Sequence, residues 1–267
     1  MMNISALAID LDGTLLVGEE LPEAHRRAVA EAHAAGIEII IATARWRQMA
    51  ERISALMGIR KPIIACSGAQ VYVPEGRDIF DHRLPADFVD AFYKLCNTRR
   101  CMVTVALDNN VILKLDAPPD QSRLPEELKW EPQLQAGPHG SPRAATVQGD
   151  DVVDIVSKDL RAEFVDSVNI YDAVGPDGKL VLIVTAKAAS KGQALLAACQ
   201  YRGINPEQVV AFGDAENDIE MFKVAGASVA MGQANDLVKS SASLVTRANT
   251  EAGVAIVIDR ILRTGSL

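Results

Sequence analysis

The sequence predicts an α/β protein in which a parallel sheet forms the core and a second, α+β domain interrupts it. Nearly continuous apolar runs occupy residues 4–9, 37–42 and 62–66, with helix-like segments between them. Such runs are typical of strands that are buried on both faces of a parallel sheet. The alternation of strand and helix stops near Leu84 and resumes at Ser190. The core is therefore expected to be split in sequence by an insertion.

The first part of the core begins with a strand from Ile4 that ends at Asp10 and Asp12. Pro22 suits the start of the helix that follows, and Gly36 suits the position just beyond its end. The other elements expected here are a short exposed flap at 15–21, a strand at 37–42, a helix at 46–58 and a strand at 62–66.

The inserted segment has a different pattern. Strands at 101–107 and 111–115 are joined by Asp108-Asn109-Asn110, which predicts an antiparallel hairpin. The stretch 117–142 is rich in proline and glycine and is expected to be mostly loop. A helix at 150–161 and strands at 165–171 and 179–186 complete the insertion. We place the inserted domain at 84–187 and the core domain at 1–83 and 188–267.

The core pattern returns with a helix from Ser190 to Arg202, which Gly203 ends. The elements expected after this helix are strands at 208–212, 228–231 and 243–246, and helices at 215–225, at 235–240 and from Thr250 onward.

Composition excludes several classes of protein. A net charge of −8 argues against a nucleic-acid or anionic-membrane partner. No stretch reaches the apolar length of a membrane span, and the N-terminal apolar run lacks the basic start of a signal peptide. The cysteines show no ligand spacing for zinc, which favours buried free thiols in a reducing cytoplasm; they are Cys66, Cys96, Cys101 and Cys199. We therefore expect a cytoplasmic protein.

Two carboxylates end the first expected strand. One residue separates Asp10 from Asp12, so a strand would place both side chains on the same face. Gly13 allows a sharp turn, and Thr14 adds a hydroxyl beside the acids. Two like charges this close need a cation between them or a proton on one of them. The alternative is a β-turn in which the acids only accept hydrogen bonds from the turn backbone.

Polar residues also end the other expected core strands. Thr43 follows the second strand, Ser67 follows the third, and Asp214 follows a later one. Ligands of open parallel sheets bind beyond the carboxyl ends of the strands, so these residues should share one crevice with Asp10 and Asp12. A set of carboxylates without histidine or cysteine favours a hard cation, and Mg²⁺ fits best. The alternative for Asp214 is that it caps a helix together with the acids after it.

Lys191 lies one residue inside a helix that Ser190 is expected to cap. A cation at a helix N-terminus is electrostatically unfavourable. Its place there makes sense if the ammonium group and the helix end both face an anion. The alternative is a lysine on the solvated surface.

Taken together, these segments resemble the haloacid dehalogenase-like superfamily, and within it the Cof-type phosphatases with a C2 cap. The insertion falls between the second and third motifs, where C2 caps lie. The resemblance implies a Rossmann-like core and a cap that serves as a substrate-specificity lid. In the family's order, the matching segments are Asp10-Leu11-Asp12-Gly13-Thr14-Leu15, Ala42-Thr43-Ala44-Arg45, Ser190-Lys191-Gly192, Gly213-Asp214-Ala215-Glu216-Asn217-Asp218 with Met221, and Glu251-Ala252-Gly253-Val254-Ala255.

The resemblance implies a role for each matching residue. Asp10 would be the nucleophile that takes the phosphoryl group, and Asp12 would act as general acid and then as general base. Thr43 and Lys191 would hold the phosphoryl oxygens. The residues that would hold Mg²⁺ are Asp10, Asp12 through its backbone carbonyl, and Asp214, supported by Asn217 and Asp218.

Two positions depart from the family pattern. Ala44 replaces a glycine and would add strain of about 1 kcal/mol if its φ angle is positive. Ser67 replaces an asparagine and has a shorter reach. The substrate contacts implied by the resemblance are Thr43, Ala44, Arg45, Ser67, Gly68, Lys191 and Asn217.

The predicted function is a Mg²⁺-dependent phosphatase that hydrolyses small phosphorylated metabolites, with sugar phosphates as the first expectation, through an aspartyl-phosphate. One alternative is a phosphotransferase or phosphohexomutase of the same superfamily, which would pass the phosphoryl group to a sugar hydroxyl. Another is a non-catalytic binding protein on the same fold. A monomer and a homodimer are both compatible with the sequence.

Overall fold

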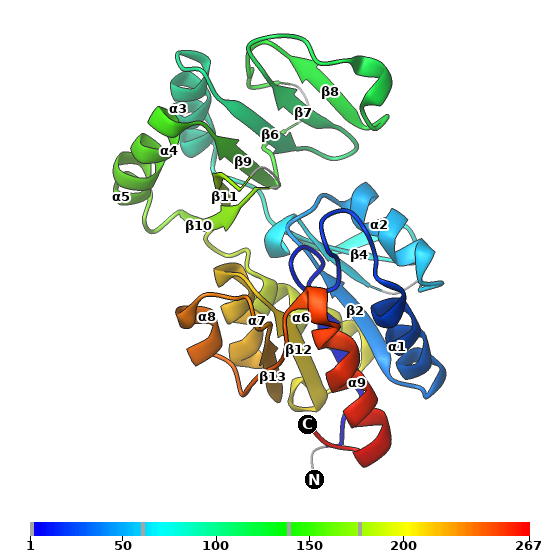
Figure 1. Ribbon diagram of the computed structural model, residues 1–267. Helices are drawn as coiled ribbons and strands as arrows, with labels where there is room; N and C mark the ends of the chain where they lie inside the picture. Colours follow the sequence, from blue (N-terminus) through cyan, green and yellow to red (C-terminus); the bar gives the residue numbers. More distant parts are fainter. Residues whose placement is uncertain (1–2, 60–61, 138–139, 176–177) are drawn as a thin grey trace. The chain divides into compact units, whose positions relative to one another are not determined.

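The computed structural model describes residues 3–59, 62–137, 140–175 and 178–267 (Figure 1). The chain divides into two compact units. Unit 1 consists of Met1–Phe80 and Ser190–Leu267, and unit 2 consists of Asp81–Ala189. These divisions lie within a few residues of the boundaries 83/84 and 187/188 that were expected from the sequence.

Unit 1 is built around one sheet in the order β14-β13-β12-β1-β2-β3-β4-β5. The strands from β14 to β3 run parallel, and β4 pairs antiparallel with β3. This mostly parallel sheet confirms the α/β fold class that the buried apolar runs predicted. The strands are β1 (Ala6–Ile9), β2 (Glu38–Ala42), β3 (Ile63–Ala65), β4 (Gln70–Val73), β5 (Arg77–Asp81), β12 (Val209–Gly213), β13 (Ala227–Ala230) and β14 (Leu244–Val245).

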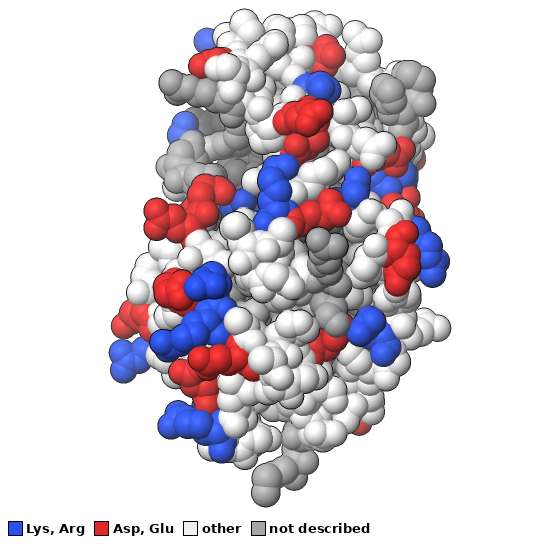
Figure 2. Space-filling view, turned by 90° about the vertical axis from the view of Figure 1, so that its right-hand side faces the viewer, with Lys and Arg blue, Asp and Glu red and all other residues white. Residues whose placement is uncertain are grey.

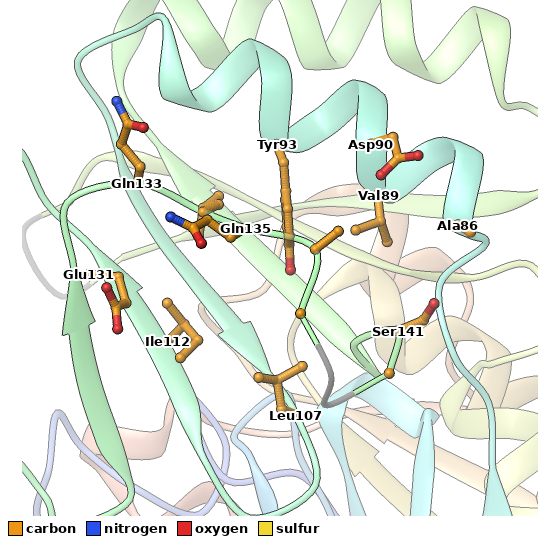
Figure 3. Close-up of a pocket in the computed structure, with 14 residues that line it drawn as sticks. Ala86, Val89, Asp90, Tyr93, Leu107, Ile112, Glu131, Gln133, Gln135 and Ser141 are labelled. Carbon is orange, nitrogen blue, oxygen red and sulfur yellow. The ribbon is translucent and has the colours of Figure 1, made fainter.

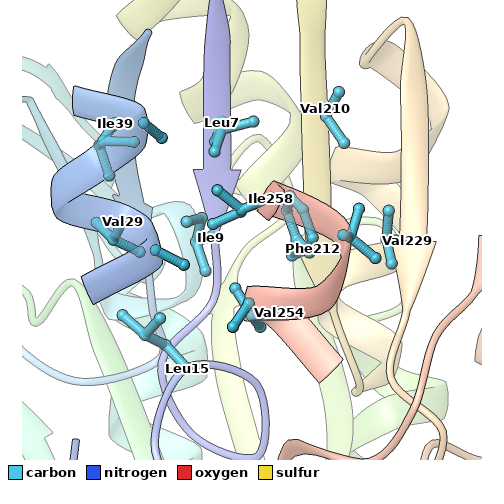
Figure 4. Packing of buried hydrophobic residues seen from close by; sticks show 14 of the residues in the cluster. Leu7, Ile9, Leu15, Val29, Ile39, Val210, Phe212, Val229, Val254 and Ile258 are labelled. Carbon is cyan, nitrogen blue, oxygen red and sulfur yellow. The ribbon is translucent and has the colours of Figure 1, made fainter. Parts of the chain in front are cut away.

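Helices cover both faces of this sheet, which explains why its strands are apolar on both sides. Leu7 and Ile9 of β1 belong to the core beneath α1 and α9, where Figure 4 shows them beside Val254 and Ile258. The alternate side chains of β1 are alanines, and they pack in a second core with α6 and α7. Burial of each large aliphatic side chain contributes about 1.5–3 kcal/mol, so this central strand is firmly held. The helices are α1 (Glu23–Ala34), α2 (Arg47–Leu56), α6 (Lys191–Arg202), α7 (Ile219–Val224), α8 (Asp236–Ser240) and α9 (Gly253–Thr264).

Unit 2 contains a second sheet in the order β10-β11-β9-β6-β7-β8. The predicted hairpin is confirmed, because β6 and β7 pair antiparallel around the turn at 108–110. Phe88, Phe92 and Phe164 contribute to its separate hydrophobic core. The elements are α3 (Ala86–Asn97), β6 (Met102–Ala106), β7 (Val111–Lys114), β8 (Leu128–Glu131), β9 (Ala144–Gln148), α4 (Asp150–Ile155), α5 (Arg161–Glu163), β10 (Val168–Val174) and β11 (Leu180–Ala186).

Several strands were missed in the sequence. The stretch 117–142 was expected to be mostly loop, yet it contains β8, which pairs in parallel with β7. This edge strand alternates partly buried Leu128 and Trp130 with exposed Lys129 and Glu131, so its apolar signal is weak. The strands β4, β5 and β9 are also short, and no prediction was made for them.

The segment 15–21, expected to be an exposed flap, is buried where it begins. Leu15 and Leu16 are fully buried in the core of unit 1. A single bridge joins Asp12 to Leu16, and the His25 Nδ1 atom lies 2.8 Å from the Leu15 carbonyl oxygen. The turn after β1 is therefore anchored to α1, and the prediction of an exposed flap was wrong for its first two residues.

His25 should make the stability of unit 1 depend on pH. The side chain is fully buried on α1, and burial lowers its pKa, although the hydrogen bond to Leu15 opposes this shift. In the unfolded chain the same group binds a proton near its ordinary pKa of 6.5. The contribution of His25 to the free energy of unfolding should therefore be complete well above pH 6.5 and should decrease as the pH falls below this value. We expect a loss of about 1 kcal/mol in the free energy of unfolding between roughly pH 7.5 and 5.5.

Urea denaturation at the two pH values measures this loss. The variant His25→Gln should show a smaller difference between the two pH values than the parent chain. His33, partly exposed on the same helix, supplies the control variant His33→Gln, which should keep the full difference. If all three proteins lost the same free energy, another group would have to be responsible.

None of the helices in the described part of the chain has the length and apolarity needed to cross a membrane. On the face drawn in Figure 2, Lys and Arg are interspersed with Asp and Glu, and the described residues form no extended basic area there.

Candidate active site

Acidic residues from two neighbouring strands meet at the carboxyl edge of the unit 1 sheet. Asp10 directly follows β1, and Asp214 directly follows β12. The two strands are parallel partners, with Ile9 opposite Phe212, so the acids leave the sheet side by side. Carboxylate oxygens of Asp10, Asp214 and Asp218 all lie within 4.8 Å of one another. We call these three residues the carboxylate cluster.

Lys191 lies against this cluster and is almost completely buried, so it is not a surface lysine. Its Nζ atom donates to Asp10 Oδ1 at 2.6 Å and to Asp218 Oδ1 at 2.7 Å. Burial alone would lower the pKa of Lys191, but the charges of Asp10 and Asp218 outweigh it and raise the pKa. Ser190 caps α6, as predicted, because its Oγ atom accepts a hydrogen bond from the backbone N–H of Gln193. The free end of this helix thus presents Lys191 to the acids.

Burial and mutual repulsion act on the acids of the cluster. Burial raises the pKa of Asp10 well above its ordinary value, while the charge of Lys191 opposes that shift. Burial and the charge of Asp218 raise the pKa of Asp214 to about 7. One ammonium group therefore does not balance the negative charge that the three carboxylates carry when ionised.

The turns on either side hold Asp214 in place. Asp218 Oδ2 accepts the backbone N–H groups of Asp214 and Ala215, each at 3.0 Å. Thr14 donates its hydroxyl to Asp214 Oδ1 at 2.9 Å. A Cβ atom on Gly13 would lie 2.1 Å from Asp214 Oδ2, and its φ is +80°, so only glycine fits here. Asp214 therefore does not cap the next helix; Asp218 binds the N–H groups of that turn.

Asp12 lies differently from the sequence prediction. The strand β1 ends at Ile9, so Asp12 lies in the following turn and not on the strand. Its half-exposed carboxylate accepts from Arg45 Nη2 at 2.6 Å and from Arg45 Nε at 2.9 Å. Arg45 also donates to both Glu19 oxygens, at 2.9 and 3.0 Å. The two carboxylates of the first motif thus have separate cationic partners.

Two of the expected site residues have contacts that were not anticipated. The third member of the carboxylate cluster is Asp218, which was expected only to support a metal from nearby; the side chain of Asp12 is not a member. Arg45 binds Asp12 and Glu19, and its expected contact with substrate stays a prediction. Glu19 was missed because it lies in an irregular segment without a motif. The proposed metal contact of Asp12 was its backbone carbonyl, which the cluster does not test.

The turns after β3 and β12 each add a polar side chain to the site. Ser67 is fully buried, and its Oγ atom accepts from Asn217 Nδ2 at 3.2 Å. Asn217 Oδ1 is buried and finds no hydrogen-bond partner among the described residues. A Cβ on Gly68 would lie 2.2 Å from the Ser190 carbonyl carbon, so this turn packs directly on the start of α6. Ser67 and Asn217 are therefore held next to Lys191.

Thr43 directly follows β2, and its side chain is fully buried. Its Oγ1 atom accepts the backbone N–H of Arg45 at 3.0 Å. Ala44 does not have a positive φ, so the condition under which alanine would add strain here is not met. The strained residues lie in the neighbouring turn, where Cys66 and Ser67 both have a φ of 52°.

A cavity of about 400 Å³ lies within unit 2, between α3 and the ends of β7 and β8 (Figure 3). Tyr93 projects into it from α3, and burial raises the pKa of this phenol to about 12. The described lining includes Asp90 and Glu131 but neither lysine nor arginine. This cavity therefore does not suit a phosphate group, in contrast to the surroundings of Lys191.

Comparisons with known proteins agree with the geometry. A family model described as haloacid dehalogenase-like hydrolase matches residues 7–258. The 5-amino-6-(5-phospho-D-ribitylamino)uracil phosphatase YcsE of Bacillus subtilis is 28% identical over 258 residues, which are 96% of this chain and 95% of the relative. A phosphoglycolate phosphatase of Methanobrevibacter smithii is 25% identical over 268 residues, covering 98% of this chain and 100% of the relative.

A solved structure of a haloacid dehalogenase-like hydrolase from B. subtilis has the same fold. Its TM-score is 0.82 at 21% identity, and the match covers 97% of this chain and 100% of that chain. The family model spans nearly the whole chain, including both segments of unit 1 and all of unit 2. The chain therefore belongs to the haloacid dehalogenase-like hydrolases, and within them it is a Cof-type phosphatase.

Proposed function

We propose that this phosphatase depends on Mg²⁺ and transfers the phosphoryl group of a small phosphorylated metabolite to Asp10 before water releases it. The observation that carries the proposal is the placement of Asp10. Its carboxylate is buried, binds Lys191 at 2.6 Å, and lies within 4.8 Å of two further acids. A carboxylate nucleophile can approach a phosphate dianion only where cations offset the charge of both.

The residues present fit a magnesium ion. The carboxylate cluster offers only oxygen donors, the ligand type that hard cations prefer. The buried Asn217 Oδ1 atom, which lacks a partner in the described chain, is a further oxygen donor at the same edge. We propose that Asp10, Asp214 and the backbone carbonyl of Asp12 hold the ion, with Asn217 and Asp218 in support. Bound there, Mg²⁺ would neutralise charge on the phosphoryl oxygens.

The side chains of the chain supply the remaining chemistry. In the first step an Asp10 oxygen forms a bond to phosphorus, and the bond to the alcohol oxygen breaks while Asp12 gives that oxygen a proton. In the second step Asp12 takes a proton from a water molecule that attacks the aspartyl-phosphate, which frees phosphate and restores Asp10. Lys191 and Thr43 hold the phosphoryl oxygens throughout. Arg45, itself bound by Glu19, fixes the direction in which Asp12 points.

The substrate class is proposed from the relatives. The two relatives described above are named for phosphate monoesters of small metabolites, one on a ribityl chain and one on glycolate. We propose that this chain acts on small phosphorylated metabolites, with sugar phosphates as the first class to test. In this proposal unit 2 serves as the lid that selects the substrate, and Ser67, Gly68 and Ala44 line the phosphate end.

Removal of the metal tests the proposal. Treatment with EDTA should lower the hydrolysis of p-nitrophenyl phosphate about 100-fold or more, and excess Mg²⁺ should restore it. Added Mg²⁺ should also raise the melting temperature of the parent chain, because an ion that binds only the folded state stabilises it. Asp214→Asn should lose this thermal shift, whereas Asp236→Asn, an exposed acid at the start of α8, should keep it. Full activity in EDTA would contradict the magnesium assignment.

A panel of phosphorylated metabolites, with Mg²⁺ present and then removed, would identify the substrate class. The panel should include a hexose 1-phosphate, because the products separate the two enzymatic alternatives. Release of inorganic phosphate without hexose 6-phosphate would support a phosphatase. Appearance of hexose 6-phosphate would instead support a mutase that uses the same aspartyl-phosphate.

A further inference from the structure

Two cysteines and a buried lysine meet in unit 2, far along the chain from the acids of unit 1. Cys96 lies near the end of α3, and Cys101 directly precedes β6; the first is fully buried and the second nearly so. Lys114, at the end of β7, places its Nζ atom 3.7 Å from Cys101 Sγ. The Cys101 thiol also donates to the backbone carbonyl oxygen of Cys96 at 3.5 Å, so its sulfur lies against Cys96. None of these three residues has a role in the phosphatase chemistry proposed above.

Lys114 is an unusual residue for a domain core. Only 3% of its side chain is exposed, and its ammonium group donates to the carbonyl oxygens of Arg99 at 2.9 Å and Cys101 at 3.4 Å. Its carboxylate partner is Asp116 at 3.0 Å, which is 41% exposed and is also bound by Arg100 at 3.3 Å. A buried ammonium group is costly unless negative charge accompanies it. A sulfur anion at Cys101 would provide such a charge.

The surroundings make the two sulfurs chemically different. The Cys96 side chain and the charge of Lys114 lower the pKa of the Cys101 thiol to about 7, although burial and Asp116 oppose this shift. The neighbouring Cys101 side chain, together with burial, raises the pKa of Cys96. The carbonyl oxygen of Arg99 also accepts from the Cys101 thiol, at 3.7 Å. Gly149 packs on Cys101 from another side, where a Cβ would lie 3.1 Å from the Cys101 Cβ. That side therefore brings no further charge to the sulfur.

We propose that Cys96 and Cys101 form a peroxide-sensitive dithiol, in which Lys114 activates Cys101 and Cys96 completes a reversible disulfide. The ligand class is a small peroxide, with hydrogen peroxide as the simplest member. Thiolates that lie beside a cation and retain some access to solvent are the sulfurs that react with peroxides. Cys101 is 7% exposed, whereas Cys96 is completely buried. The pair thus constitutes a modification site that is separate from the phosphatase residues.

The chemistry balances with peroxide as the only co-reactant. The Cys101 thiolate attacks one oxygen of hydrogen peroxide, the O–O bond breaks, and hydroxide leaves, which yields the sulfenic acid of Cys101. The Cys96 sulfur then attacks the Cys101 sulfur, the S–O bond breaks, and the hydroxyl leaves as water with the proton of Cys96. The dithiol loses two electrons and two protons, and the peroxide becomes two molecules of water.

Peptide mapping of the full chain tests the proposal directly. Trypsin cuts after Lys94, Arg99 and Arg100, so Cys96 and Cys101 fall in separate peptides, 95–99 and 101–114. After treatment with hydrogen peroxide and alkylation of the remaining thiols, these peptides should appear as one linked species that dithiothreitol separates. A link between Cys101 and Lys114 would instead block cleavage after Lys114, and that result would overturn the dithiol assignment.

Variants show whether oxidation of Cys96 and Cys101 depends on activation by Lys114 or is unspecific. Cys96→Ser should stop at the sulfenic acid, which dimedone would trap at Cys101. Lys114→Met keeps most of the side chain but removes its charge, and it should slow formation of the linked species about tenfold or more. Cys199→Ser removes a thiol whose pKa burial raises to about 11, and it should leave the rate unchanged.

A measurement on the parent chain avoids any effect of substitution on folding. At about pH 7, iodoacetamide should alkylate Cys101 at least about tenfold faster than Cys199, because only the thiolate reacts. Equal alkylation rates for the two cysteines would overturn the proposal. Linkage in Lys114→Met at the rate of the parent chain would overturn it as well.

Discussion

The variant Asp10→Asn should lose hydrolysis of p-nitrophenyl phosphate by a factor of about 10⁴ or more. The amide nitrogen and oxygen of asparagine occupy nearly the same space as the carboxylate, but asparagine cannot form the aspartyl-phosphate. Steady-state kinetics with saturating Mg²⁺ measure the loss. The parent chain should also yield a phosphorylated peptide containing Asp10 after a rapid acid quench, and the variant should not.

The free energy of unfolding of Asp10→Asn shows whether its loss of activity comes from the missing nucleophile or from a damaged fold. Burial raises the pKa of Asp10 well above its ordinary value, which means that folding disfavours its ionised form. A neutral amide should therefore leave the free energy of unfolding unchanged or raise it, and Lys191 keeps Asp218 as a partner. Asp236→Asn is the control for activity, since this residue is exposed on α8. Unchanged activity in Asp10→Asn would refute the nucleophile assignment.

The variant Lys191→Met should lower kcat/KM by a factor of about 10²–10³, because the cation that would face the phosphoryl group is removed. It should also lower the free energy of unfolding by about 3–5 kcal/mol, since Asp10 and Asp218 lose the ammonium group that they share. Activity assays and urea denaturation measure the two effects. Lys223→Met, at an exposed lysine paired with Glu220, should change neither by much.

A second substitution separates the two roles of Lys191. In Lys191→Met with Asp218→Asn, one of the uncompensated acids is gone, so part of the lost stability should return. Activity should stay low, because no ammonium group has been restored. Recovery of both properties together would indicate that Lys191 has only a structural role.

Much of the site could be anticipated because parallel strands impose its layout. Once β1 and β12 were expected to be parallel, the acids that follow them had to leave the sheet at one edge. The placement of Lys191 opposite negative charge could also be predicted, because a lysine at a helix N-terminus is otherwise electrostatically unfavourable. The structure provides that charge in the form of Asp10 and Asp218.

The parts that could not be anticipated depend on the path of loops. Asp12 pairs with Arg45 because β1 ends at Ile9 and the chain then turns, and no periodic pattern marks that end. The part played by Glu19 follows from the same turn. Similarly, β8 shows only a short alternation between prolines, and its pairing with β7 is set by tertiary contacts.

The order β12-β1-β2 in the sheet has a consequence for synthesis on the ribosome. Thr14 and its partner Asp214 are 200 residues apart, so about 10–40 s of translation separate them at ordinary elongation rates. All of unit 2 emerges within that interval, and it has a hydrophobic core of its own. The nascent chain therefore carries Asp10 without Lys191, Asp214 or Asp218 until unit 2 has been made, and we expect no phosphatase activity from it during that interval.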